Sequence, residues 1–138
     1  MIGRHQIVEE LASLYREEGY PTFKRTEFDG LYPDLRVGEK LRHALVIKVE
    51  TYRQLDSPRI QEDWWRFDQN YKEWFLCVHN DHWNDAEDLC DMWGIKNATI
   101  FAWEEDDDGE IWFHDAPFLE EAPIAVPYKA PSLQTARR

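Results

Sequence analysis

Three charged residues in the first half of the chain could do chemistry together: Asp34, Lys48 and Glu50. Asp34 lies at the start of a short predicted strand, 33–37 (PDLRV), and the other two alternate with apolar residues in the segment 43–51 (HALVIKVET). Because side chains in a β-strand repeat every two residues, Lys48 and Glu50 project from one face, roughly 6–7 Å apart along the strand. A hairpin between the two strands would bring Asp34 alongside Glu50. One strand pair can thus present two carboxylates and an ammonium at one end of a sheet.

Two carboxylates and a lysine are the groups needed for metal-assisted hydrolysis of a phosphodiester. Asp34 and Glu50 would hold a hard divalent cation, Mg²⁺ or Mn²⁺. That cation polarises a phosphoryl oxygen and lowers the pKa of a bound water. Lys48 would position the water or stabilise charge on the phosphate. The competing interpretation of the same three residues is a structural ion-pair cluster.

The elements that must position these residues follow from the periodicity of the apolar residues. The sequence predicts, in order, a helix at 5–18, strands at 22–28, 33–37 and 43–51, a helix that runs to about residue 74, a strand at 75–79, a helix at 83–93, and strands at 98–103 and 111–114. This order is typical of an α/β (α+β) fold with a mixed central sheet flanked by helices. We expect one domain over residues 1–118 and an extended or partly disordered tail at 119–138, which carries three prolines.

The order helix, three strands, helix, strand, with Pro33-Asp34 on the second strand and a charged triplet on the third, resembles the PD-(D/E)xK nuclease superfamily. The resemblance covers about residues 5–101. It implies a restriction-endonuclease-like αβββαβ core, a metal bound by Asp34 and Glu50, and Lys48 as the catalytic lysine. It also implies that an acid of the first helix, Glu9 or Glu10, completes the site.

The chain departs from that superfamily at the triplet itself. The superfamily has an acid, any residue and then a lysine, whereas this chain has Lys48, Val49 and Glu50 in that order. A rearranged site would keep a metal and hydrolyse DNA phosphodiesters. Alternatively, the Lys48 ammonium would stand in for the metal, and the protein would be a catalytically inactive interaction module on a nuclease fold. A weaker third hypothesis is an acidic protein that mimics DNA.

Composition limits the partners of this chain. It has 28 acidic and 16 basic residues and a net charge of −12, which repels polyanions at long range and argues against a general nucleic-acid coat protein. A nucleic acid is therefore expected to bind only through a local basic patch. The other expected partners are a different protein or a second copy of this chain, since many nuclease-fold enzymes are dimeric. No apolar stretch approaches the ~20 residues that span a membrane. Two cysteines without metal-finger spacing predict free thiols in a reducing compartment, the cytoplasm.

Aromatic and histidine residues outside the triplet give further expectations. Trp64 belongs to the apolar stripe of its helix and is predicted to be core, whereas Trp65 points about 100° away, where either it is exposed for a base to stack on, or it contacts a partner or is covered by the C-terminal tail. His79 and His82 have a spacing that can chelate a metal, but few other ligands lie near them, so we expect a loop there. Cys77 lies within an apolar strand and is expected in the core.

Overall fold

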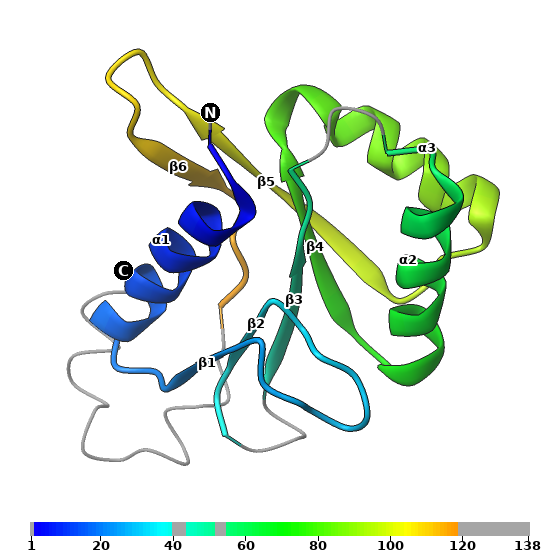
Figure 1. Ribbon diagram of the computed structural model, residues 1–138, viewed down its shortest axis with the longest axis horizontal. Helices are drawn as coiled ribbons and strands as arrows, with labels where there is room; N and C mark the ends of the chain where they lie inside the picture. The colour runs from blue at the N-terminus through cyan, green and yellow to red at the C-terminus, as the bar shows by residue number, and fades with distance from the viewer. Residues whose placement is uncertain (1, 40–43, 52–54, 119–138) are drawn as a thin grey trace.

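The computed structural model describes residues 2–39, 44–51 and 55–118, and within them it has one six-stranded sheet and three α-helices (Figure 1). The elements are α1 (Arg4–Glu17), β1 (Thr22–Lys24), β2 (Leu35–Val37), β3 (Leu45–Val49), α2 (Pro58–Asn70), β4 (Trp74–His79), the 3₁₀ turn η2 (Asn80–His82), α3 (Trp83–Trp93), β5 (Ala98–Glu105) and β6 (Ile111–His114). The expected mixed sheet flanked by helices is confirmed. Across these residues, no helix is both long enough and apolar enough to cross a bilayer.

The strands lie in the sheet in the order of the sequence, β1 to β6. The first three form an antiparallel meander, β3, β4 and β5 run parallel to one another, and β6 returns antiparallel beside β5. The helices α2 and α3 form the crossovers between the parallel strands, as parallel pairing requires. The carboxyl ends of β3, β4 and β5 therefore meet at one edge, where open α/β sheets usually bind their ligands.

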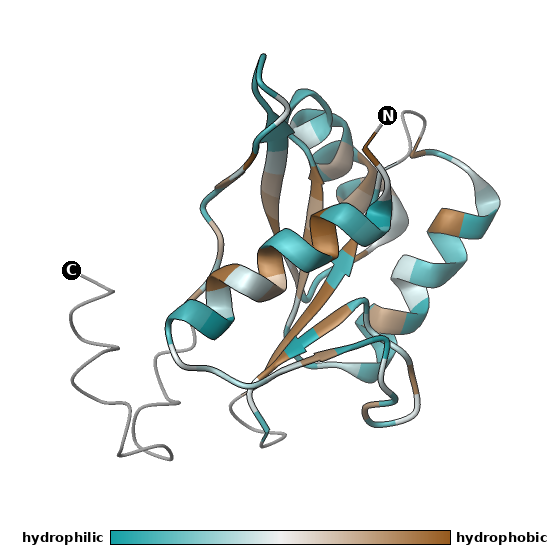
Figure 2. Cartoon of the chain, turned by 60° about the vertical axis from the view of Figure 1, so that its left-hand side comes forward, coloured by the Kyte–Doolittle hydropathy of each residue, from teal (hydrophilic) through white to brown (hydrophobic). Residues whose placement is uncertain are grey.

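The two faces of the sheet are covered by different helices. In Figure 1, α1 lies on one side of the strands, and α2 and α3 lie on the other. The α1 residues Ile7, Leu11 and Tyr15 pack with one side of the strands, whereas Trp64 of α2 belongs to the second apolar cluster. In Figure 2 the strands are coloured mostly as hydrophobic, whereas hydrophobic and hydrophilic residues alternate along α1.

Local residue types account for the start of α2, the end of α3 and the burial of one tryptophan. The Ser57 hydroxyl accepts a hydrogen bond from the Ile60 amide at 3.1 Å, which caps the start of α2. Gly94 ends α3 in the left-handed conformation, at φ 72°. Trp64 is fully buried, as predicted, and among the described residues the adjacent Trp65 is 52% exposed.

Two predicted boundaries are wrong. The helix expected to reach residue 74 ends at Asn70, because Tyr71 is extended and Trp74 already pairs with Ala98 in the sheet. Tyr71 and Trp74 continue the apolar stripe only because they pack against the same core. The strand expected at 22–28 ends at Lys24, since Arg25 has a left-handed backbone with φ of 51°.

Both cysteines are free and buried, which confirms the expected core position of Cys77. Burial raises the pKa of the Cys77 thiol well above its usual value, with a smaller contribution from Asp34, and burial raises the pKa of Cys90 to about 12. Because only the thiolate is nucleophilic, we expect neither cysteine of the native protein to be alkylated by iodoacetamide at pH 8 on a timescale of minutes.

Mass spectrometry of tryptic peptides would measure this labelling site by site. Both cysteines should be alkylated fully in urea, which serves as the control for the reagent. Rapid modification of Cys77 without denaturant would contradict its position in the core.

Candidate functional site

Glu50 lies directly after β3, at the carboxyl end of the parallel strands. Its backbone amide donates to the Cys77 carbonyl at 2.9 Å, so the chain stays in sheet register up to this residue. The indole N–H of Trp103, on β5, donates to the Glu50 carbonyl at 3.2 Å. These two bonds fix the backbone of Glu50, and the residue is only 2% exposed.

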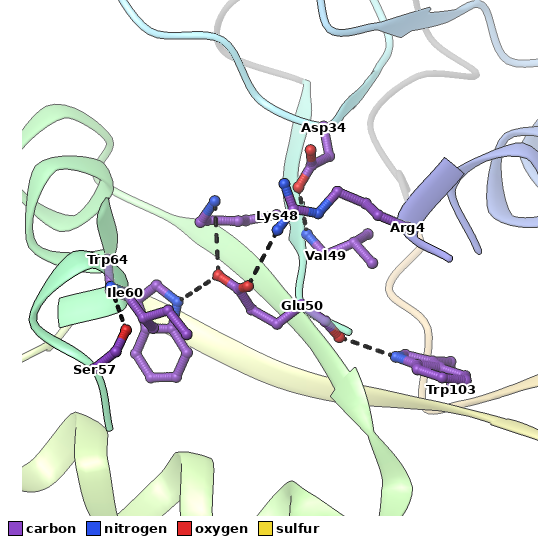
Figure 3. A network of polar contacts seen from close by, with 9 residues as sticks. All are labelled: Arg4, Asp34, Lys48, Val49, Glu50, Ser57, Ile60, Trp64 and Trp103. Carbon is purple, nitrogen blue, oxygen red and sulfur yellow. Dashed lines mark hydrogen bonds and ion pairs between the residues drawn. The ribbon is translucent and has the colours of Figure 1, made fainter. Parts of the chain in front are cut away.

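The Glu50 carboxylate receives groups from three separate elements (Figure 3). Nη2 of Arg4, the first residue of α1, lies 3.4 Å from Oε1. The indole N–H of Trp64, on α2, donates to Oε2 at 2.9 Å. Nζ of Lys48, on β3, lies 3.6 Å from the same oxygen. Both carboxylate oxygens are therefore already engaged by the protein itself.

Lys48 and Glu50 lie on one face of β3, as the strand period predicts. Leu45, Ile47 and Val49 pack on the α1 side of the sheet. The Lys48 ammonium lies on the α2 side, 5.4 Å from the centre of the Phe67 ring, at a distance suited to a cation–π contact. Its side chain is 10% exposed, so this charge depends on the protein for compensation.

Asp34 occupies the neighbouring position one residue before β2. The antiparallel register pairs Leu35 with Ile47, so its continuation sets Asp34 opposite Lys48. Its Oδ2 accepts a hydrogen bond from the Val49 amide at 2.7 Å, and the residue is buried. The structure thus brings Asp34, Lys48 and Glu50 to the same end of β3, with one Asp34 oxygen bound to the strand backbone.

The acids of α1 lie elsewhere. Glu9 forms ion pairs with Lys24 and Arg16, and the Lys24 partner is the main cause of its lowered pKa. Glu9 and Glu10 line a cavity between α1 and the β5–β6 hairpin. Arg4 is instead the α1 residue whose side chain reaches Glu50.

The sequence held signals for the partners of Glu50 that were missed. Arg4 precedes Ile7, Val8 and Leu11 at helical spacing, so it extends the apolar face of α1 toward the sheet. A cation on that face indicates an acidic partner inside the fold. A buried tryptophan also needs an acceptor for its indole N–H, and the prediction that Trp64 is core implied such an acceptor.

In this arrangement the Glu50 carboxylate contacts protein groups at the oxygens that a divalent metal would need. Arg4 and Lys48 both pair with the Glu50 carboxylate, so two cations lie 3.4 and 3.6 Å from the oxygens that a metal would use. Mg²⁺ also needs near-octahedral oxygen ligands, and the Glu50 oxygens already receive an arginine, a lysine and an indole N–H. Over residues 2–39, 44–51 and 55–118, no group of three or more His, Cys, Asp or Glu side chains is placed to hold a metal.

Two histidines, His79 at the end of β4 and His82 in the η2 turn, are also engaged within the fold. Nδ1 of His79 accepts the Asp81 amide at 3.0 Å, so its Nε2 carries the proton and lies 3.2 Å from Oε1 of Glu105. His82 lies in the η2 turn, in agreement with the loop expected there. Their ring centres are 5.9 Å apart.

Comparisons with known proteins add no relative to this description. A scan against models of protein families gives no match, and a search of curated proteins gives none either.

Proposed function

We propose that this chain is a PD-(D/E)xK-like, nuclease-fold protein that acts by binding another protein and not by hydrolysis. The fold supports the first part of the proposal. The order helix, three strands, helix, strand matches the αβββαβ core, with an antiparallel meander followed by a parallel fourth strand. Further support is the resemblance of the Pro33-Asp34 pair before β2 and the charged pair at the end of β3 to the site motif of that superfamily.

One observation carries the non-hydrolytic part of the proposal: both oxygens of the Glu50 carboxylate are engaged by protein groups. Binding of another protein is supported by the net charge of −12 and by the exposed tryptophans Trp65 and Trp112. Lys48 and Arg4 supply the positive charge that a metal would supply in a nuclease. A buried ion pair of this kind is not by itself strong evidence for stability, but here it also blocks the position of a metal. Arg4 and Lys48 are thus the counter-ions of the Glu50 carboxylate.

Metal-dependent hydrolysis of DNA phosphodiesters is the second candidate, because Asp34 and Glu50 approach the same end of β3 with a lysine between them. In that case Asp34 and Glu50 would have to release the Val49 amide and the Arg4 and Trp64 side chains to bind Mg²⁺ or Mn²⁺. The net charge of −12 opposes the approach of DNA as well.

Calorimetric titration with Mg²⁺ and Mn²⁺ distinguishes the two candidates. We expect no binding to the wild type, and no change in Asp34→Ala or Glu50→Ala. Binding to the wild type that disappears in both variants would overturn the proposal and justify assays of DNA cleavage.

The double variant Lys48→Glu/Glu50→Lys restores the acid–x–lysine order without changing the net charge, and it serves as the complementary test. Mn²⁺ binding by this variant alone would support the view that residue order at these two positions excludes the metal. Its urea unfolding curve must be measured alongside, because the swap also changes the contacts with Arg4 and Trp64.

A further inference from the structure

The strand β6 forms one edge of the sheet, and no described strand pairs with its outer side (Figure 1). The Asp106 amide donates to the Glu110 carbonyl at 2.9 Å, in continuation of the β5–β6 register. Because bonded and non-bonded residue pairs alternate in an antiparallel ladder, Trp112 also bonds to β5. Ile111 and Phe113 then turn two N–H and two C=O groups outward. No residue that the structure describes bonds to these four groups.

The side chains of β6 lie on two different faces. Ile111 and Phe113 pack with the apolar cluster that includes α1. Trp112 points to the other face, since side chains alternate along a strand, and it is 54% exposed. Its indole N–H donates to Oδ2 of Asp106 at 3.0 Å, which holds the ring in place. A strand added to β6 would therefore continue a face beside α1 and cover an exposed indole on the other.

The helix α1 leaves space beside this edge. A cavity of about 560 Å³ opens between α1 and the β5–β6 hairpin, within the usual volume range of ligand pockets. The hairpin lines it with the consecutive residues 109–112, and α1 lines it with His5, Gln6, Glu9 and Glu10. The outer edge of β6 thus borders a cavity whose α1 wall is polar and acidic.

The edge at β6 lacks the features that usually prevent strand addition, which are lysine, proline, bulges and very short strands. The opposite edge strand, β1, has three residues, includes Lys24 and stops before the left-handed backbone of Arg25. By contrast, β6 reads Ile-Trp-Phe-His and keeps a regular register with β5 along its whole length. Glu110 and Asp115 flank it in the sequence. These acids and the net charge of −12 oppose a second copy of this chain and attract a basic segment.

We propose that β6 binds an extended basic segment of a partner protein, which adds antiparallel to it as a further strand of the sheet. Directly opposite residues of an antiparallel pair share a face. Segment residues opposite Ile111 and Phe113 therefore exchange main-chain hydrogen bonds with β6 and point toward α1, where lysine or arginine meets the acidic cavity wall. The alternate residues cover Trp112. This inference names the partner chemistry of the proposed interaction module, and so it rests on that proposed function.

Nuclear magnetic resonance titration of the full chain with the peptide acetyl-Lys-Val-Lys-Val-Lys-Val-amide tests the inference at low ionic strength. In the free protein, the amides of Ile111 and Phe113 should exchange with solvent faster than the amide of Trp112. The peptide should shift the resonances of the first two amides and slow their exchange. Amides of Ile111 and Phe113 that are already protected in the free protein would overturn the inference, because a second copy or residues 119–138 would then occupy the edge.

Two methylated peptides of identical charge and composition separate strand addition from charge attraction. One is N-methylated at its three lysines, whose amides face β6 in the proposed arrangement, and the other at its three valines, whose amides face away. Methylation at lysine should weaken binding about tenfold or more, because each main-chain hydrogen bond contributes about 1 kcal/mol. Methylation at valine should leave the affinity within about twofold. Equal affinities or the reverse order would overturn the proposed arrangement.

A pair of protein variants tests the same edge from the other side. Phe113→Pro removes an outward N–H that β5 does not use, at a position where an edge strand tolerates proline. Phe113→Ala removes the same ring and keeps the N–H, so it is the matched control. The proline variant should bind the unmethylated peptide about tenfold more weakly than the alanine variant. Equal affinities in two variants whose spectra show a folded protein would contradict pairing at this edge.

Failure here is distinct from failure of the proposed function. Absence of peptide binding, together with absence of metal binding, would overturn only the strand addition at β6. Metal binding by the wild type would overturn the proposed non-hydrolytic function while leaving the peptide result to stand by itself.

Discussion

Glu50→Ala is expected to lower the free energy of unfolding by about 3–5 kcal/mol, the usual cost of removing one partner from a buried ion pair. The change leaves the Lys48 ammonium buried without its carboxylate. It also removes the acceptor of the Trp64 indole N–H, which is buried in the core. Urea unfolding followed by tryptophan fluorescence measures the effect.

Glu50→Gln divides this loss into its two parts. A glutamine keeps an oxygen for the Trp64 indole N–H but removes the charge that faces Arg4 and Lys48. Its destabilisation should therefore be smaller than that of the alanine variant. The size of the remaining loss measures how strongly the two cations depend on the carboxylate.

Two further variants control this experiment. Glu62→Ala removes a glutamate that is exposed on α2 and pairs with Arg66, and it should change the free energy of unfolding by less than about 0.5 kcal/mol. Lys48→Met/Glu50→Leu replaces the buried pair by apolar groups and should recover the part of the loss that comes from the unpaired Lys48 ammonium, while the Trp64 indole N–H stays without its acceptor. A Glu50→Ala protein as stable as Glu62→Ala would contradict a buried, compensated carboxylate.

Asp68→Ala is expected to lower the free energy of unfolding by about 2–4 kcal/mol, because buried donors that lose their acceptor cost about 1–3 kcal/mol each. The Asp68 carboxylate accepts the Trp74 indole N–H at 3.0 Å and the amides of Lys96 and Asn97 at 2.9 and 2.7 Å. It therefore ties α2 to the start of β4 and to the loop before β5.

Hydrogen exchange at the amides of Lys96 and Asn97 gives a local measure beside urea unfolding. Both amides should exchange faster in Asp68→Ala. Asp63→Ala, a change of the same residue type on the same helix, is the control and should stay within about 0.5 kcal/mol of the wild type. Unchanged protection of the Lys96 and Asn97 amides in the Asp68 variant would contradict the hydrogen bonds that join Asp68 to the loop before β5.

The predictions that rested on local periodicity agree best with the structure. A period of two set Lys48 and Glu50 on one face of β3, and a period of 3.6 separated the buried Trp64 from the exposed Trp65. The cap at Ser57 follows equally from local chemistry. These features depend on neighbours a few residues apart, and the sequence displays such neighbours directly.

Boundaries failed where tertiary packing extended a local pattern. Tyr71 and Trp74 fit the helical stripe of α2, yet pairing of Trp74 with Ala98 draws the chain into the sheet. Arg25 has no residue-type signal for its left-handed backbone, which ends β1. For Trp74 the deciding contact, with Ala98, lies beyond the window in which a periodicity can be recognised.

The sequence by itself determined the types and the common face of the charged residues on β3, the alternation of elements and the apolar faces that bury them. Only the tertiary structure decided what those charges do. Arg4 lies 46 residues from Glu50 along the chain, and Trp103 lies 53 residues from it. Arg4, Lys48 and Trp64 surround the Glu50 carboxylate because α1, β3 and α2 converge on it. No spacing within a single element encodes that convergence.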